Sequence, residues 1–495
     1  MKTTRMEIAQ PAIAVRAIRP QVYVACCFLF CTIATGMAIG HSAVLLPNLQ
    51  LQNSTIVLDE EMGSWIASLY SIVGPLGAAL GGCAIDIYGR RKVVITAGSC
   101  LVLGWLLITT AQNGTMILIG RILEGLARSI GGTGNTVLGD ELSDPRFRGL
   151  IVCTLLTGIT TGVFAMSTFG AFLNWRIASG LATLLGFITF LMYCFIYESP
   201  TWLVRKDRLK EAEDVLIQLW GPGREKQAKE ELKDLIKRLR GEESSSTTRQ
   251  KIITMVKYLF KPFVLKPFLI MLFFNAIQAF CGLNLFTFYA VDMLSKTRRH
   301  GIEVLDDYYT NILVSSLRTI TIITTCFLIF SIGRRQLALA SGISSFIPAL
   351  IIGFILIPSN SGSIPASIEI YILFILIIIY AIGMTFGFYA LTGIMIGETQ
   401  PSKIRGFACG FIYAMNDLVL GSILKLYPWL ISTLEIHGMF LMFGVSCALC
   451  TVFVYFFLPE TQGLTLLEIE DYFKQPNIMW VTRKRKDKNI EDEEM

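Results

Sequence analysis

The sequence has little charge and almost no histidine for its length. Only 16% of its 495 residues are charged, and the three histidines, His41, His300 and His437, lie far apart. It contains no pair of CxxC motifs, no glycine-rich phosphate loop followed by lysine, and no Ser, His and Asp set in one solvent compartment. These absences argue against a metal site, a nucleotide cofactor and hydrolase chemistry. We therefore predict no metal, no cofactor and no enzyme.

Hydrophobic residues, in contrast, make up 53% of the chain, and the mean hydropathy is +0.59. A bilayer core needs roughly 20 apolar residues per helix, and no alternating strand pattern competes with helix here. The first apolar segment follows a polar start and lacks a cleavage site, so we expect it to be retained. The sequence predicts an all-α membrane protein with twelve transmembrane helices. They are expected near residues 22–46, 63–85, 93–111, 115–138, 150–172, 177–197, 267–292, 309–331, 336–357, 368–396, 407–430 and 437–458.

The distribution of lysine and arginine predicts the orientation of these helices. With both termini in the cytoplasm, the outer segments hold only Arg176, Lys296, Arg298 and Arg299 out of 43 basic residues. The formal charge of +6 then reflects topology, and no nucleic-acid partner is expected. Asn53, in an Asn-Ser-Thr sequon, falls in the first outer loop and is the expected glycosylation site. The twelve cysteines fall in or beside apolar segments, which predicts packing and not disulfides.

Short motifs occur twice in the same order, about half the chain apart. The repeated motifs are Gly89-Arg90-Arg91 with Gly333-Arg334-Arg335, Glu141 and Arg148-Gly149 with Glu398 and Arg405-Gly406, and Glu198 with Glu460. Six-helix halves in the same order form a parallel repeat, which places a substrate site between two bundles that rock against each other. The repeat therefore predicts a transporter built from two pseudo-symmetric six-helix bundles.

The charge pattern divides the chain into five expected parts. They are a cytoplasmic N-terminus (1–19), a first bundle (20–197), a cytoplasmic helical linker (198–262), a second bundle (263–460) and a cytoplasmic tail (461–495). Within the linker, a helix-period pattern over 207–219 and 225–240 predicts short helices, with Leu209, Ala212, Val215 and Leu216 on one face.

Charged residues at the expected cytoplasmic ends of the helices form a candidate latch. A carboxylate there can bond helix N-termini and guanidinium groups, and it can hold the cytoplasmic side shut in one state and release it in another. The predicted latch residues are Asp86, Arg90, Arg91, Glu141 and Arg148 in the first half, and Arg334, Arg335, Glu398 and Arg405 in the second.

These motifs, taken in order, resemble the sugar porter family of the major facilitator superfamily. The resemblance also covers Gly120-Arg121, Trp175-Arg176, the run from Glu198 to Leu203, and Pro459-Glu460-Thr461. It implies the major facilitator fold and sugar contacts by Gln278, Asn284 and Asn416, because sugar hydroxyls need groups that both donate and accept. The alternative for each amide is a hydrogen bond between helices. Gly282 is expected to let its helix bend, and Phe286, Phe288 and Tyr289 to form an outer gate.

The chain also departs from the pattern that the resemblance implies. Leu156, Ala279, Arg318, Thr385 and Gly393 stand where hydrogen-bonding or aromatic pocket residues are expected, and Ala390 and Thr392 replace two prolines. A guanidinium inside the membrane is costly unless it is paired or faces water. Arg318 is therefore a substrate-binding candidate for an anionic cargo, or else the ion-pair partner of a buried acid such as Asp417.

Two further charged clusters lie in the first half. Arg121, Glu124 and Arg128 share one helix face, where Glu124 is expected to bridge both arginines. His41 stands where proton-coupled relatives carry an acid that pairs with the arginine matching Arg121. The charged form of His41 is disfavoured beside that arginine, so uniport is the simpler expectation.

We therefore predict a facilitative uniporter of a sugar such as trehalose or a hexose, working by alternating access. It is expected to be a monomer in the lipid bilayer of the plasma membrane. The alternatives are a carrier of an organic anion or sugar acid that uses Arg318, and a non-transporting sugar sensor. Uptake of labelled sugars and sugar acids separates these possibilities.

Overall fold

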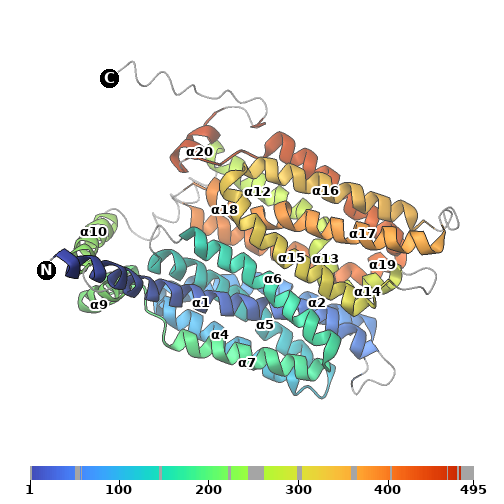
Figure 1. Cartoon of the computed structure of the whole chain (residues 1–495), viewed down its shortest axis with the longest axis horizontal. Coiled ribbons are helices and arrows are strands. Elements are labelled where there is room, and N and C mark those ends of the chain that lie inside the picture. The colour runs from blue at the N-terminus through green and yellow to red at the C-terminus, as the bar shows by residue number, and fades with distance from the viewer. Residues whose placement is uncertain are drawn as a thin grey trace.

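A computed structural model describes residues 3–50, 56, 58–143, 148–220, 224–243, 261–297, 304–357, 365–401, 404–464, 466–475 and 479–480. Asn53 and the side chain of Arg148 lie outside this description. Every regular element in the described residues is helical, and Figure 1 shows the helices running side by side along the long axis of the molecule. The predicted all-α class is confirmed.

The first half of the chain forms one bundle. Its helices are α1 (Thr3–Gln50), α2 (Glu60–Ile72), α3 (Gly74–Tyr88), α4 (Arg90–Thr109), α5 (Gly114–Leu142), α6 (Arg148–Phe172) and α7 (Trp175–Cys194). Helix α1 packs along α6, and α4 packs between α5 and α7. Helices α2 and α3 are two parts of one membrane span, separated only at Val73. Helix α1 begins well before the predicted residue 22.

The second half forms a matching bundle. Its helices are α12 (Pro262–Phe280), α13 (Leu283–Phe288), α14 (Ala290–Thr297), α15 (Asp307–Ser331), α16 (Arg334–Ile355), α17 (Ala366–Met384), the π-helix η2 (Thr385–Tyr389), α18 (Ala390–Thr399) and α19 (Arg405–Phe457). The two bundles meet where α15 packs against α6 and where α19 packs against α2 and α3. Between these two seams, α1 also contacts α13 and α14.

The predicted count of twelve spans agrees with the helices. Ten described helices are long and apolar enough to cross a membrane. Helix α5 is a further long helix, which carries Arg121, Glu124 and Arg128 in its middle. The 53 residues of α19 contain two of the predicted spans, because Glu435 has non-helical dihedral angles (φ 53°, ψ −179°) between them.

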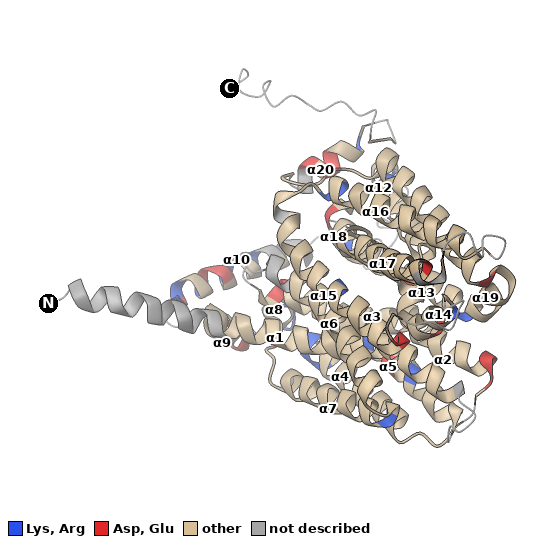
Figure 2. Ribbon diagram, turned by 45° about the vertical axis from the view of Figure 1, so that its right-hand side comes forward, with Lys and Arg blue, Asp and Glu red and all other residues tan. Residues whose placement is uncertain are grey.

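Short helices between the bundles lie at one end of the molecule, which we call the linker end (Figure 1). They are α8 (Pro200–Arg205), α9 (Leu209–Trp220) and α10 (Glu225–Glu243), and α20 (Leu466–Phe473) follows the second bundle. Ala212 and Leu216 of α9 are buried against Trp202 and Leu232, as the predicted apolar face requires. Figure 2 shows charged residues on α10 and α20, whereas most of the bundle ribbon is uncharged.

The seventh span is broken at Gly282, as predicted. This glycine has φ of 89°, a left-handed conformation that other residues rarely adopt. A Cβ atom there would lie 2.5 Å from the ring of Phe443. The chain therefore changes direction between α12 and α13 at a position that tolerates only glycine.

The tenth span contains a π-helical turn at η2, without a proline in its sequence. Ser341 of α16 inserts its hydroxyl into the backbone ladder, where it donates to the carbonyl oxygen of Gly383 at 2.6 Å and accepts from the backbone N–H of Phe388 at 2.9 Å. Gly387 permits this approach, since a Cβ there would lie 2.2 Å from that of Ser341. An inserted side chain of this kind widens a helix locally, and the result is η2.

Candidate transport site

Three amide side chains, on α12, α13 and α19, are the expected sugar-binding residues. Gln278 is buried, Asn284 is partly buried, and none of Gln278, Asn284 and Asn416 makes a side-chain hydrogen bond to another described residue. The buried Oδ1 of Asn416 is among the polar atoms without a partner. A buried polar group without a partner costs roughly 1–3 kcal/mol. The alternative of helix-to-helix hydrogen bonds is therefore not observed for these three residues.

Arg318 of α15 is buried, with 5% of its surface exposed, and two threonines hold its guanidinium. Its Nη1 donates to Thr287 Oγ1 at 2.8 Å, and its Nε donates to Thr385 Oγ1 at 3.2 Å. Each threonine hydroxyl already donates its own proton to a backbone carbonyl within its helix, Thr287 to Leu283 and Thr385 to Ala381. Both oxygens thus face Arg318 as acceptors, and neither is charged.

The position of Thr287 links Arg318 to the amides. Asn284 and Thr287 lie three residues apart on α13 and therefore on the same helix face. Thr385 reaches Arg318 from η2, the segment that Ser341 widens. The break at Gly282 and the π-helix thus both place hydrogen-bonding groups around Arg318.

The expected ion pair between Arg318 and Asp417 is absent, and this interpretation was wrong. Asp417 of α19 instead accepts from Nη2 of Arg128 on α5, with an N–O distance of 2.6 Å. Glu124 does not bridge two arginines as expected, because its ion pair is with Arg121 at 2.9 Å. Arg128 faces the other bundle, and a helix-face pattern does not carry that information.

Arg121 and Glu124 form a fully buried pair within the first bundle. Arg121 also donates to the carbonyl oxygen of Ala38 at 2.7 Å and to the hydroxyl of Ser42. His41 does not take the place of an acid partner. Its Nε2 lies 2.9 Å from Ser179 Oγ, and its ring packs edge-on against Trp105. The acid that compensates Arg121 thus lies on its own helix.

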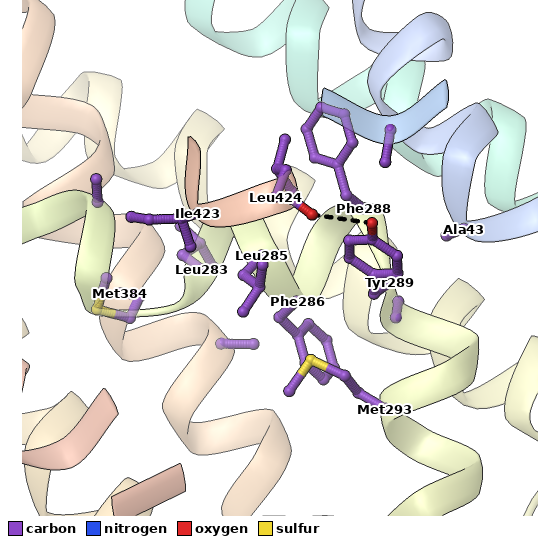
Figure 3. Packing of buried hydrophobic residues seen from close by; sticks show 14 of the residues in the cluster. Ala43, Leu283, Leu285, Phe286, Phe288, Tyr289, Met293, Met384, Ile423 and Leu424 are labelled. Carbon is purple, nitrogen blue, oxygen red and sulfur yellow. Dashed lines mark hydrogen bonds between the residues drawn. The ribbon is translucent and has the colours of Figure 1, made fainter. Parts of the chain in front are cut away.

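The three aromatic gate candidates lie where the bundles meet or within the broken span. Phe288 packs against Tyr70 of α2, with ring centroids 6.1 Å apart. The ring of Tyr289 stacks on that of Tyr427, with centroids 3.9 Å apart. The Tyr289 hydroxyl donates to the carbonyl oxygen of Leu424 at 3.1 Å, as Figure 3 shows. Phe286 is buried in the core beside them.

A lysine joins the bundles at the end opposite the linker. Lys425 Nζ of α19 donates to Ser64 Oγ of α2 at 2.8 Å and lies 4.1 Å from the ring centroid of Trp65. This contact and the Arg128–Asp417 pair both connect the two bundles.

The latch candidates form matching ion pairs, one in each bundle at the linker end. Arg90 bonds both carboxylate oxygens of Glu141, at 3.0 and 3.2 Å, and Arg334 lies 3.3 Å from Glu398. Arg91 and Arg335 bond backbone carbonyls of the last helix in their own half, at Cys194 and Tyr455. Arg405 bonds the carbonyl oxygen of Gln400 and is not paired with Glu398.

Asp86 was expected to bond the neighbouring helix N-terminus, but another acid does so. Asp86 is largely exposed and lies 3.6 Å from Arg90. Glu198 accepts from the backbone N–H groups of Arg90 and Arg91 at 2.9 and 3.1 Å. Glu460 does the same for Arg334 and Arg335. The repeat of Glu198 as Glu460 was the sequence signal for this role.

The remaining departures lie on three helices. Leu156 is partly buried on α6, Ala279 is buried on α12, and Gly393 of α18 would place a Cβ 3.2 Å from the hydroxyl of Tyr413. Arg318 and Thr385 are the one pair of departures joined by a hydrogen bond among the described residues.

Solved structures with the same fold define the class of protein. The proton:xylose symporter XylE, bound to 6-bromo-6-deoxy-D-glucose, superposes with a TM-score of 0.70 over 92% of this chain and 99% of that one, at 17% sequence identity. The chain thus has the major facilitator fold of a multi-pass membrane protein, as predicted. A family model described as "Sugar (and other) transporter" matches residues 24–473, and the chain belongs to that family. The family is one of transporters, in agreement with the prediction from the sequence.

Curated relatives from insects are similar along most of the chain. The facilitated trehalose transporter Tret1 of Aedes aegypti is 27% identical over 467 residues, which cover 94% of this chain and 56% of the relative. Tret1 of Apis mellifera ligustica is 28% identical, over 90% of this chain and 88% of the relative. The chain spans about half the length of several of these relatives.

Proposed function

We propose that this chain is a facilitative transporter that carries a sugar through the membrane by alternating access. The observation that carries the proposal is the set of three amides, Gln278, Asn284 and Asn416, without hydrogen-bond partners among the described residues. They belong to three helices of one bundle, and an amide both donates to and accepts from a hydroxyl. Trehalose and hexoses are the first sugars to test, because the similar insect proteins are named for trehalose transport.

The contacts between the bundles support a state closed at the end opposite the linker. Lys425 with Ser64, and Arg128 with Asp417, hold the two bundles together there and in the middle of the spans. The pairs Arg90–Glu141 and Arg334–Glu398 each lie within one bundle, so they brace the linker end of each half separately. Rocking of the bundles would then break the first two contacts and expose the amides to the other side.

The finer features of this proposal follow from the sequence. The five-part division at residues 1–19, 20–197, 198–262, 263–460 and 461–495 places both termini and the linker in the cytoplasm. The protein works as a monomer in the plasma membrane, surrounded by lipid. The buried Arg121–Glu124 pair, with His41 bonded elsewhere, favours uniport over proton coupling.

Uptake into proteoliposomes tests the proposal. We expect saturable entry of labelled trehalose or glucose down its gradient, with no dependence on a proton gradient. Gln278→Ala is expected to raise KM about tenfold, because it removes hydrogen bonds to the sugar. Ser432→Ala, whose hydroxyl bonds Trp429 in its own helix, is the control. Absence of saturable flux for every sugar, with folded protein, would overturn the proposal.

A further inference from the structure

Arg318 is a buried cation without a described acid beside it. Its hydrogen bonds go to Thr287 and Thr385, and its titratable neighbours are Tyr380 and Tyr389. Asp417, the acid that the sequence offered, is taken by Arg128. An isolated buried charge costs several kcal/mol unless a counter-charge arrives or water reaches it. Resting on the proposed function, we infer that the site selects a sugar carrying a carboxylate, which supplies this counter-charge.

The geometry leaves part of the guanidinium available to such a ligand. Nε and Nη1 donate to the threonines, while Nη2 makes no hydrogen bond to a described residue. The threonine hydroxyls hold the plane of the group in place without neutralising it, because both act as acceptors with their own protons engaged. A carboxylate bound at Nη2 would form a charge-assisted hydrogen bond, which is roughly twice as strong as a neutral one.

The charges nearby favour one negative charge on the ligand. Arg121 and Arg128, which also lie in the middle of a span, are already compensated by Glu124 and Asp417. A carboxylate balances the single free charge of Arg318. A phosphate monoester carries close to two negative charges at neutral pH and would leave about one uncompensated in the membrane interior. A uronate therefore fits this site better than a sugar phosphate.

The amides explain why the ligand is a sugar acid and not a small carboxylate. Asn284 lies one helix turn from Thr287 on the same face of α13, so it faces the same region as Arg318. Gln278 makes no side-chain hydrogen bond to a described residue, and the buried Oδ1 of Asn416 is without a partner among them. A uronate places its carboxylate and its hydroxyls on one ring, so it can engage the cation and the amides together.

The test is competitive uptake with the full chain in proteoliposomes. The probes are labelled glucuronate, glucose, trehalose and glucose 6-phosphate, with Arg318→Gln, Arg318→Lys and wild type compared. Arg208→Gln is the matched control, since Arg208 pairs with Glu211 on the exposed linker. We expect the wild-type protein to take up glucuronate at least tenfold more efficiently than glucose. The Arg318→Gln variant should lack this preference. Arg318→Lys is expected to retain part of it, because the charge remains. Uptake of glucuronate should also depend on membrane potential.

Binding measured separately keeps the two proposals distinguishable. Thermal stabilisation of detergent-solubilised protein by glucuronate, lost in Arg318→Gln, would support the inference even if no sugar were transported. Saturable flux of glucose or trehalose, unchanged in Arg318→Gln and without glucuronate binding, would overturn the inference and leave the proposed function standing. A stronger response to glucose 6-phosphate than to glucuronate would also overturn it. If Arg318→Gln does not fold, Thr287→Val and Thr385→Val test the same site, because these threonines orient the Arg318 guanidinium. A higher KM for glucuronate alone would support the inference. An equal rise in KM for glucose would contradict it.

Discussion

The guanidinium of Arg128 lies 2.6 Å from the carboxylate of Asp417, and this pair joins the two bundles in the middle of the membrane spans. Both side chains are mostly buried, with 24% and 14% of their surface exposed. A Cβ atom added to Gly74 would lie 2.3 Å from Asp417 Oδ2, so the backbone at the break between α2 and α3 packs directly against the pair. The contact between the halves thus combines the ion pair, the small size of Gly74 and the helix break at Val73.

The pair predicts strong coupling between its two members. Asp417→Asn and Arg128→Gln should each lower stability, because each leaves the other charge buried without its partner. The double variant should be destabilised less than the sum of the two, with a coupling energy of about 1–3 kcal/mol. Thermal unfolding in detergent micelles measures this cycle. Additive effects would show that the pair does not hold the bundles together.

Gly282 predicts a severe effect of a single methyl group. Gly282→Ala combines a left-handed backbone with a Cβ placed 2.5 Å from the ring of Phe443. The conformational part alone costs about 1–2 kcal/mol, and the overlap adds to it.

A second glycine is the control for this substitution. Gly397 of α18 has no atom within 4 Å of the position of its Cβ. Gly397→Ala should leave the melting temperature unchanged or raise it, because alanine favours helix by about 1 kcal/mol. Equal melting temperatures for the two variants would contradict the proposed strain at Gly282.

Glu198 and Glu460 predict matching effects in the two halves. Each carboxylate accepts backbone N–H groups at the start of a helix, so each glutamine substitution removes charge-assisted bonds and a favourable dipole interaction. We expect Glu198→Gln and Glu460→Gln each to cost about 1 kcal/mol and to be additive. Glu211→Gln, in an exposed pair with Arg208, should cost less than about 0.5 kcal/mol. The readout is the melting temperature, and a neutral result for either variant would refute its capping role.

Ser341 predicts a local change that reaches the site. Ser341→Ala leaves the buried N–H of Phe388 without its acceptor and should cost about 1–3 kcal/mol. It should also shift Thr385 and raise KM for the substrate that Arg318 binds. Ser345→Ala on the same helix is the control, since the hydroxyl of Ser345 donates to the backbone carbonyl oxygen of Ser341, within α16. Equal KM values for the two variants would show that the shape of η2 does not affect substrate binding.

Much of the fold could be predicted because it follows from local pattern. Apolar length predicted the spans, the repeated motifs predicted two halves, and Gly282 predicted the break in the seventh span. The α9 face was visible as helix periodicity in the linker. Each of these signals can be read within a short stretch of sequence. The evidence for two halves is that such short stretches occur twice.

Partner choice between helices could not be predicted in the same way. Arg128 and Asp417 are far apart in sequence and belong to different bundles. Partners within the same bundle were expected instead, Glu124 for Arg128 and Arg318 for Asp417. The role of Ser341 was also hidden, because a serine inside a helix gives no sign that its hydroxyl enters the backbone of another. Residues that act across an interface depend on packing, which periodicity does not encode.

The π-helical turn in the tenth span depends on a hydroxyl supplied by α16, so its shape is a shared property of two helices. A proline would interrupt the backbone hydrogen bonds there whatever the neighbouring helix did. Here, sliding α16 away from α17 would return the Gly383 carbonyl and the Phe388 amide to ordinary helical bonds and draw Thr385 off Arg318. The separation of these two helices would then set how firmly the buried cation is held at each stage of a transport cycle.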